Sequence, residues 1–299
     1  MKIFVAVFLF LLTLFLYLHI NHNLKTSNDL EIYDLGMQDS KVRFEDICNL
    51  KQPVLFRFEN VDAIVNEANL LNVSNKYADY EIQFRQLNDS QESSEYHLPL
   101  KLSSCISLFS SKNTHDMSVS ESKDDELKYY SSNNADFINE TGLSSVIKAH
   151  DAFIKPPLLC NYSYDYIFAS KNANTPLAYE LNYRTYYTVT QENVRVKLCP
   201  PKYAKYLSVS ADYENMEFKS NINVWNAETS KVKFMEIELN VGDTIFIPPY
   251  WLYSFFFPSE KASMVCYKYR TYMNNVAIAN HYLLHFLQLQ NIKCKRPPL

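Results

Sequence analysis

A succession of short strands between Tyr164 and Tyr269 is the feature that most limits the folds open to this chain. Apolar, β-branched and aromatic runs alternate there with turn-forming residues. Strands this short and this closely spaced favour a β-sandwich or barrel over a repeat of strand and helix. The aromatic content of 15%, mostly Tyr and Phe, agrees because such side chains suit a half-buried pleated surface. The expected strands are Tyr164–Ser170, Ala178–Asn182, Thr185–Thr190, Val194–Leu198, Ala204–Val209, Val232–Glu238, Thr244–Ile247, Ser254–Phe257 and Ser263–Tyr269.

An apolar run from Ile3 to Ile20 sets the N-terminus apart, interrupted only by Thr13 and His19. As a helix, a run of this length covers roughly 27 Å, which suffices for a thin bilayer. The alternative is a cleaved signal peptide, but the run is longer than a usual signal core and no small-residue cleavage site follows it. We therefore expect an uncleaved single-pass anchor. Lys2, ahead of the run, predicts a cytoplasmic N-terminus and a lumenal or external domain.

These patterns divide the chain into four parts. Residues 1–20 form the transmembrane anchor, 21–45 a polar stalk, 46–272 the β-rich domain, and 273–299 a C-terminal amphipathic helix and tail. Within the domain, the stretch 88–135 is rich in Ser, Asn and Asp and carries weaker structural signals. The last helix is expected over Asn274–Ile292, where apolar residues recur at helical spacing. Such a helix usually packs on its own domain, and the alternative is a protein partner or self-association.

The most informative motif runs from Val241 to Tyr253, with the sequence VGDTIFIPPYWLY. Gly242 and Asp243 predict a tight turn because glycine tolerates a positive φ. A buried strand follows, and a proline pair ends it. This pattern resembles the late strand pair of cupin-like, JmjC-type proteins, and the segments 174–180 (NTPLAYE), 194–201 (VRVKLCPP) and 53–58 (PVLFRF) resemble other parts of the same family in the same order.

The resemblance implies a fold that is mainly β: a double-stranded β-helix, or jelly roll, with flanking helices and the N-terminal transmembrane helix. It covers about residues 50–272. The segment 269–292 is similar to the tail of cupin-like proteins encoded by large DNA viruses, which implies a place in a virion or a virus-modified host membrane.

The family's metal site is degenerate at the matching positions. Active members hold Fe(II) with two His and one carboxylate and leave positions open for 2-oxoglutarate and oxygen. The matching residues here are Ala178, Glu180 and Tyr253. Alanine cannot bind a metal, and a phenol with a pKa near 10 binds Fe(II) poorly. The family's 2-oxoglutarate-binding Lys is also missing near Asn193, so we expect no cofactor, with Fe(II) and 2-oxoglutarate as the alternative.

A vestigial pocket for a small ligand is the second possibility at this place. Its candidate residues are Thr175, Asn182, Tyr187, Arg195, Lys197 and Trp251. The ordinary alternatives are that Glu180 is a hydrogen-bonded strand carboxylate and that Tyr253 is a core aromatic. Likewise, Arg195 and Lys197 alternate along one strand as on a solvent-facing surface.

Other sequence signals exclude several classes of function. A net charge of −4 with mixed acids and bases predicts no nucleic-acid binding. Three glycines cannot build a phosphate-binding loop. Six widely spaced cysteines show no zinc or thioredoxin pattern and leave disulfide formation open. His281 and His285 have a zinc-compatible spacing, but no third ligand is near them in the sequence.

Three functional hypotheses follow. The first is a membrane-anchored, non-catalytic cupin-like domain that serves as a structural or interaction module. The second is an Fe(II)/2-oxoglutarate-dependent protein hydroxylase with relocated ligands. The third is a lumenal lectin-like module that uses Tyr250 and Trp251 as an aromatic platform.

Overall fold

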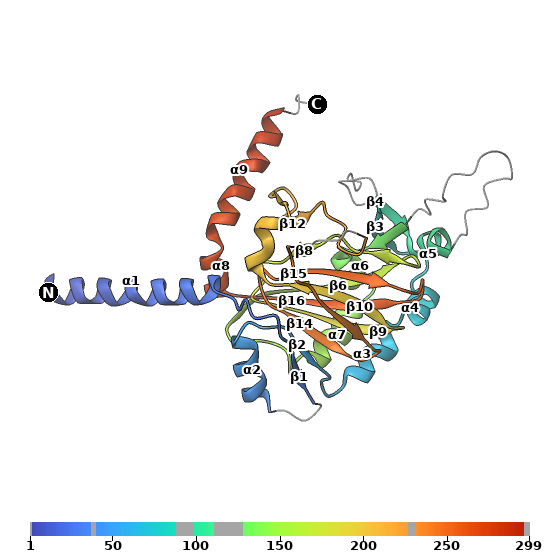
Figure 1. Cartoon of the computed structure of the whole chain (residues 1–299), viewed down its shortest axis with the longest axis horizontal. Coiled ribbons are helices and arrows are strands. Elements are labelled where there is room, and N and C mark those ends of the chain that lie inside the picture. The colour runs from blue at the N-terminus through green and yellow to red at the C-terminus, as the bar shows by residue number, and fades with distance from the viewer. Residues whose placement is uncertain (1, 37–39, 88–97, 111–127, 227–230, 296–299) are drawn as a thin grey trace.

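Two large β-sheets form the body of the molecule, with helices on one side and a long apolar helix projecting from it (Figure 1). The computed structural model describes residues 2–36, 40–87, 98–110, 128–226 and 231–295, and the side chains of the last helix as far as residue 291. Residues 88–97 and 111–127, within the Ser- and Asn-rich stretch, lie outside the described residues. The architecture is mixed α/β rather than mainly β, because helices cover much of the larger sheet.

The larger sheet has nine strands and is antiparallel apart from its first pair, which is parallel. Its longest strands lie in the middle, where β9, most of β16 and the second half of β6 are buried. In spatial order the strands are β1 (Tyr33–Leu35), β2 (Val54–Phe56), β14 (Thr244–Ile247), β9 (Arg184–Gln191), β16 (Ser263–Thr271), β6 (Leu159–Ala169), β5 (Lys128–Ser131), β3 (Glu81–Leu87) and β4 (Leu98–Lys101).

The smaller sheet has seven strands and is antiparallel throughout. Its strands are β11 (Val209–Asp212), β12 (Glu217–Ser220), β8 (Ala178–Tyr179), β15 (Leu252–Phe257), β10 (Val194–Cys199) and β13 (Met235–Leu239) in spatial order, with β7 (Ala173–Asn174) paired beside β15.

Helices cover the outer face of the nine-stranded sheet, and the chain's last two helices lie near the end of the first. The helices are α1 (Lys2–Leu24), α2 (Lys41–Asn49), α3 (Val61–Ala68), α4 (Leu70–Lys76), α5 (Leu102–Ser110), α6 (Ala135–Glu140), α7 (Leu143–His150), α8 (Tyr272–Ala277) and α9 (Ala279–Lys295), with a 3₁₀ helix at Pro201–Tyr206. Side-chain oxygens of Ser40, Asn69 and Thr271 accept hydrogen bonds from the first turns of α2, α4 and α8 and so fix where these helices begin.

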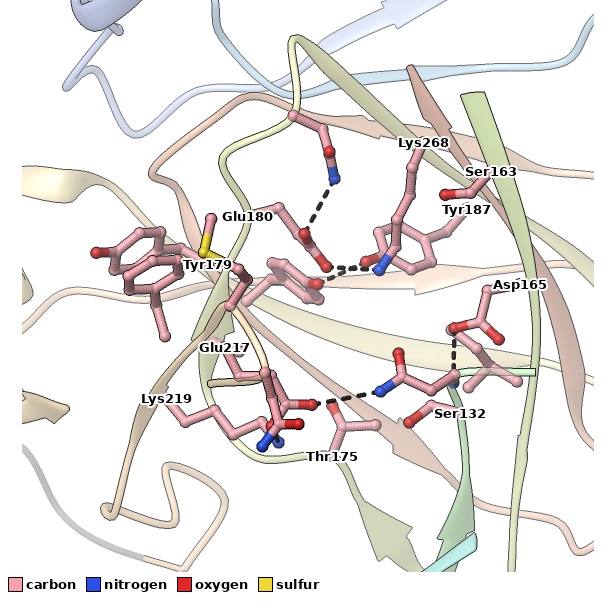
Figure 2. Close-up of a pocket in the computed structure, with 18 of the residues that line it drawn as sticks. Ser132, Ser163, Asp165, Thr175, Tyr179, Glu180, Tyr187, Glu217, Lys219 and Lys268 are labelled. Atoms are coloured by element: carbon pink, nitrogen blue, oxygen red, sulfur yellow. Dashed lines mark hydrogen bonds and ion pairs between the residues drawn. The ribbon is translucent and has the colours of Figure 1, made fainter. Parts of the chain in front are cut away.

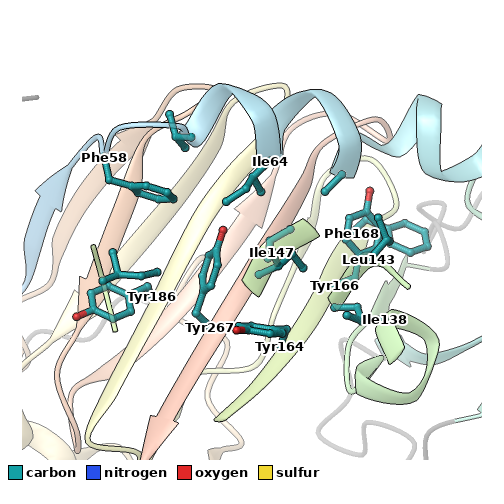
Figure 3. Close-up of a cluster of buried hydrophobic side chains, with 14 of the residues drawn as sticks. Phe58, Ile64, Ile138, Leu143, Ile147, Tyr164, Tyr166, Phe168, Tyr186 and Tyr267 are labelled. Atoms are coloured by element: carbon teal, nitrogen blue, oxygen red, sulfur yellow. The ribbon is translucent and has the colours of Figure 1, made fainter. Parts of the chain in front are cut away.

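Side-chain alternation along the central strands creates two separate cores. In β9, Tyr186 faces the helices, whereas Tyr187 faces the smaller sheet. The first core packs strand residues such as Tyr164 and Tyr267 against Ile64 of α3 and its helical neighbours (Figure 3). The second core fills part of the space between the two sheets.

The helix α1 is the one described helix long and apolar enough to cross a membrane. Its side chains are exposed along almost its whole length. Only its C-terminal end is tied to the domain. There Asn23 is buried, the Lys51 ammonium donates to the carbonyl oxygens of His22 and of Lys25 (2.8 Å for Lys25), and α8 packs against α1.

Several expectations from the sequence are confirmed. The strand Thr244–Ile247 has the expected bounds, and Gly242 has the positive φ, +86°, that the tight turn requires. A methyl group on Gly242 would also lie 2.7 Å from the Arg57 guanidinium.

Three element-level expectations are wrong. A strand was expected at Ala204–Val209, but proline at the start favours the 3₁₀ helix that ends at Tyr206. Part of the expected stalk, 21–45, is built into the domain: β1 pairs with β2, and Leu30 and Ile32 pack against the second core. The C-terminal helix is broken at the buried Ile278 into α8 and α9, and the apolar face of α9 is exposed rather than packed.

Candidate functional site

A cavity of about 330 Å³ opens between the two sheets, beside the second core (Figure 2). Strands β6 and β16 of the larger sheet form one wall. The strands β8, β12 and β15 of the smaller sheet form the other. The cavity is therefore the part of the intersheet space that apolar side chains leave unfilled.

Strand alternation explains why polar side chains reach the cavity. In β16, Met264 and Cys266 point into the second core, so Lys268 and Arg270, two and four residues further on, lie on the same face. In β6, Ile167 belongs to the second core, and the same face continues through Asp165 and Ser163 into the cavity.

Ala178, Glu180 and Tyr253, the three positions expected from the resemblance to correspond to metal ligands, lie close together. Ala178 and Tyr253 are register partners in neighbouring strands, and Glu180 follows two residues after Ala178. All three line the cavity. The Tyr253 hydroxyl accepts a hydrogen bond from the Tyr187 hydroxyl at 2.6 Å. Burial, together with the neighbouring Glu180 carboxylate, holds the pKa of Tyr253 well above its ordinary value, so this phenol stays protonated.

Glu180 is engaged by a lysine that the sequence analysis did not single out. The Lys268 ammonium lies 2.8 Å from Glu180 Oε1, and the Asn182 amide donates to Oε2 at 3.0 Å. The two charged side chains are 22% and 25% exposed, so water screens them only partly. Burial is the largest single influence and disfavours the charged ammonium, but the combined attraction of neighbouring groups, with Glu180 foremost, raises the pKa of Lys268 well above its usual value.

A second charged group forms around Glu217 of β12, which meets Arg85 of β3. Both Glu217 oxygens lie 3.0 Å from the Arg85 guanidinium, and the Lys219 ammonium lies 2.5 Å from Glu217. The backbone N–H groups of Asn133 and Asn134 donate to the Asp165 carboxylate at 3.0 and 2.7 Å. Burial nevertheless raises the pKa of Asp165.

The charges that line the cavity balance one another. Asp165, Glu180 and Glu217 are the acidic residues, and Lys219, Lys268 and Arg270 are the basic ones. Arg270 donates to the Asn182 side-chain oxygen at 2.6 Å and to the Tyr282 hydroxyl at 2.7 Å. The cavity therefore offers many polar contacts but little net attraction for a strongly charged molecule.

The remaining predicted pocket residues divide into two groups. Thr175, Asn182 and Tyr187 line the cavity. Arg195 and Lys197 do not: they lie beside Trp225 and Glu236, with the Arg195 guanidinium 3.1 Å from Glu236.

Trp251 also lies away from the cavity lining. It is 0% exposed within the second core, so it cannot stack on a sugar.

The charged cavity residues that the sequence analysis missed are Asp165, Glu217, Lys219, Lys268 and Arg270. A signal was present for Lys268, because it follows Met264 and Cys266 at a spacing of two in an otherwise apolar strand. No comparable signal in the sequence indicated that Glu217 would line the cavity, since β12 was not expected as a strand.

No metal site is evident in the part of the chain that the structure describes. It contains no group of three or more His, Cys, Asp or Glu side chains that could hold an ion. His285 Nδ1 contacts the Tyr213 carbonyl oxygen, and the His281 ring packs on Tyr213 and Phe218. Cys48, Cys105, Cys160, Cys199 and Cys266 are free thiols. The side chain of Cys294 lies outside the described residues.

Comparison with known proteins gave no match to any family model and no match to a curated protein sequence. The likeness to cupin-like proteins therefore stays a prediction drawn from short motifs.

Proposed function

We propose that this protein is a membrane-anchored, non-catalytic cupin-like domain that serves as a structural or interaction module. Under this proposal, the two sheets correspond to the family's jelly roll, and the cavity corresponds to its former metal centre. The helix α1 is an uncleaved anchor that holds the domain at the lumenal or external side of the membrane.

The observation that carries the proposal is the ion pair between Lys268 and Glu180. In the active family, the retained carboxylate would bind a metal cation. Here the ammonium of Lys268 supplies the positive charge, and Asn182 occupies the other carboxylate oxygen. The charge of Glu180 is thus satisfied by the protein itself.

The residues present do not fit Fe(II) and 2-oxoglutarate. Ala178 offers no donor atom, and the hydroxyl of Tyr253 is protonated and already bound to Tyr187. A doubly charged anion would also enter a cavity whose basic side chains have partners in the wall. We therefore derive no oxidation step for this site.

The junction between α1 and the domain supports the uncleaved anchor. Lysine at the end of a helix stabilises the free carbonyl groups there, and Lys51 does so from inside the domain. Cleavage between His22 and Lys25 would cut the turn of helix whose carbonyl oxygens Lys51 binds.

Calorimetry on the full chain in detergent micelles tests the proposal. Fe(II) and 2-oxoglutarate, added anaerobically at millimolar concentration, should produce no binding heat. A cooperative thermal transition of the same sample would show that the domain is folded. One-to-one binding of either compound would overturn the assignment as a non-catalytic module and favour the hydroxylase alternative.

A further inference from the structure

The outward face of α9 is apolar. Leu283, Leu284, Phe286 and Leu287 are 59%, 41%, 56% and 48% exposed, respectively. They lie within two turns of one another, so they form a continuous surface, which we call the α9 face. A contiguous exposed apolar surface of this kind usually marks a site that binds a protein, a membrane or an apolar ligand.

The inward side of α9 is held by polar and aromatic contacts to the domain. Tyr282 accepts a hydrogen bond from Arg270 at 2.7 Å, and His285 contacts the Tyr213 carbonyl oxygen. The His281 ring lies 5.5 Å from the Phe218 ring. Because these contacts orient the helix, the α9 face is turned away from the protein.

The position of α9 relative to α1 indicates what covers this face. Figure 1 shows that α9 runs along the flank of the domain from which α1 projects, and that it runs across the direction of α1 rather than beside it. The short helix α8, which leads into α9, packs against α1. The 23 residues of α1 extend about 34 Å as a helix, enough to cross a hydrocarbon core of about 30 Å, so its domain-proximal end lies at the membrane surface.

We infer that α9 is an interfacial helix whose apolar face binds the surface of the same phospholipid bilayer that α1 crosses. A helix that lies in the plane of a membrane buries its apolar side at the level of the acyl chains. The inference rests on the proposed anchoring by α1.

Site-directed fluorescence in vesicles tests the inference on the full chain. Cys160, which is exposed, and Cys294 are replaced by Ser, and an environment-sensitive fluorophore is attached at Leu283→Cys or Phe286→Cys. The protein is reconstituted in phosphatidylcholine–phosphatidylserine vesicles with and without lipids that carry a nitroxide in the acyl chain. Leu71→Cys is the matched control, because Leu71 is an exposed leucine (62%) on α4, on the opposite side of the domain from α1 in Figure 1.

The lipid-borne quencher should lower the fluorescence at positions 283 and 286 by roughly twofold or more and leave position 71 unchanged. Quenching of 283 and 286 by aqueous iodide to the same extent as position 71 would overturn the inference. Protection from both quenchers would overturn it in favour of a second copy of the chain on the α9 face.

A label at Phe8→Cys in α1 separates the inference from the anchoring on which it rests. Phe8 is 65% exposed in the middle of the apolar run. Lipid quenching at position 8 without quenching at 283 and 286 would refute the interfacial helix alone. Absence of lipid quenching at position 8 would refute the anchor and the inference together.

Discussion

Lys268 and Glu180 form an ion pair in the cavity wall that joins β16 to the segment after β8. Removing one member of a partly buried ion pair leaves the other charge with fewer partners. For this reason the effects of the two substitutions on the free energy of unfolding should not be additive, and a double-mutant cycle measures the difference.

Lys268→Met should lower the free energy of unfolding of the full chain by about 2 kcal/mol, because Glu180 keeps only the Asn182 amide as a partner. The double variant Glu180→Gln, Lys268→Met should recover much of the loss, since neither charge remains. Urea unfolding followed by circular dichroism in detergent micelles measures both. Additive losses in the double variant would show that the pair is not coupled.

Gly242→Ala should destabilise the protein by about 1–2 kcal/mol, since a side chain is unfavourable at a φ of +86°. The added methyl group would also displace the Arg57 guanidinium, which donates to the Val241 carbonyl oxygen. Gly36→Ala is the matched control, because no atom lies within 4 Å of a methyl group there. Thermal unfolding of the two variants compares them directly, and equal melting temperatures would contradict the expectation.

At the scale of single residues the sequence itself predicted the glycine turn, whereas the convergence of positions 178, 180 and 253 was expected only through the resemblance to cupin-like proteins. It did not predict Lys268 as the partner of Glu180. That contact joins residues 88 positions apart in different sheets, and local periodicity carries no information about such pairs.

Among the elements, β6, β9 and β16 stand out for the tyrosines on their buried faces. Tyr166, Tyr186 and Tyr267 are fully buried in the first core, and burial raises the pKa of each phenol above its ordinary value. An unfolded chain ionises its tyrosines near pH 10, whereas these side chains keep their protons in the folded protein. The folded state then binds more protons than the unfolded state.

Stability should therefore be fully present below about pH 10 and fall as the pH rises further. Alkaline titration, with tyrosinate absorbance and near-ultraviolet circular dichroism recorded together, tests this. A large share of the tyrosinate signal should appear only as the tertiary signal is lost. Complete ionisation of the tyrosines with an unchanged dichroism spectrum would contradict the burial of these rings.

The sequence located most strands from Tyr164 onward because each one alternates or is uniformly apolar. It missed β12, whose sequence EFKS is short and mostly polar, and it placed a strand where Pro201 starts a 3₁₀ helix. Strand partners, and hence the division into two sheets, depend on contacts between distant segments and were expected only through the family resemblance.

At the scale of the whole molecule, the proposed anchor predicts that no signal peptidase removes the N-terminal helix. The membrane-bound protein should keep residues 2–24, because the end of α1 is held by Lys51 and α8. Intact mass measurement of protein isolated from membranes tests this, and a mass that lacks the N-terminal segment would show a cleaved signal peptide. As a control on insertion, Leu9→Asp with Leu12→Asp should release the chain in an alkaline carbonate wash that leaves the unaltered chain in the membrane.

The contact between α1 and α8 also determines how the domain responds to mechanical load. Through this packing contact, part of the tension on the anchor is passed to α8, and α8 continues directly from β16. That strand lies between β6 and β9 and is hydrogen-bonded to both along most of its length, so a pull along it must shear two ladders at once. The covalent chain after α1 leads to β1, an edge strand of the sheet, so the packing of α1 on α8 is the contact that passes part of the load to a central strand.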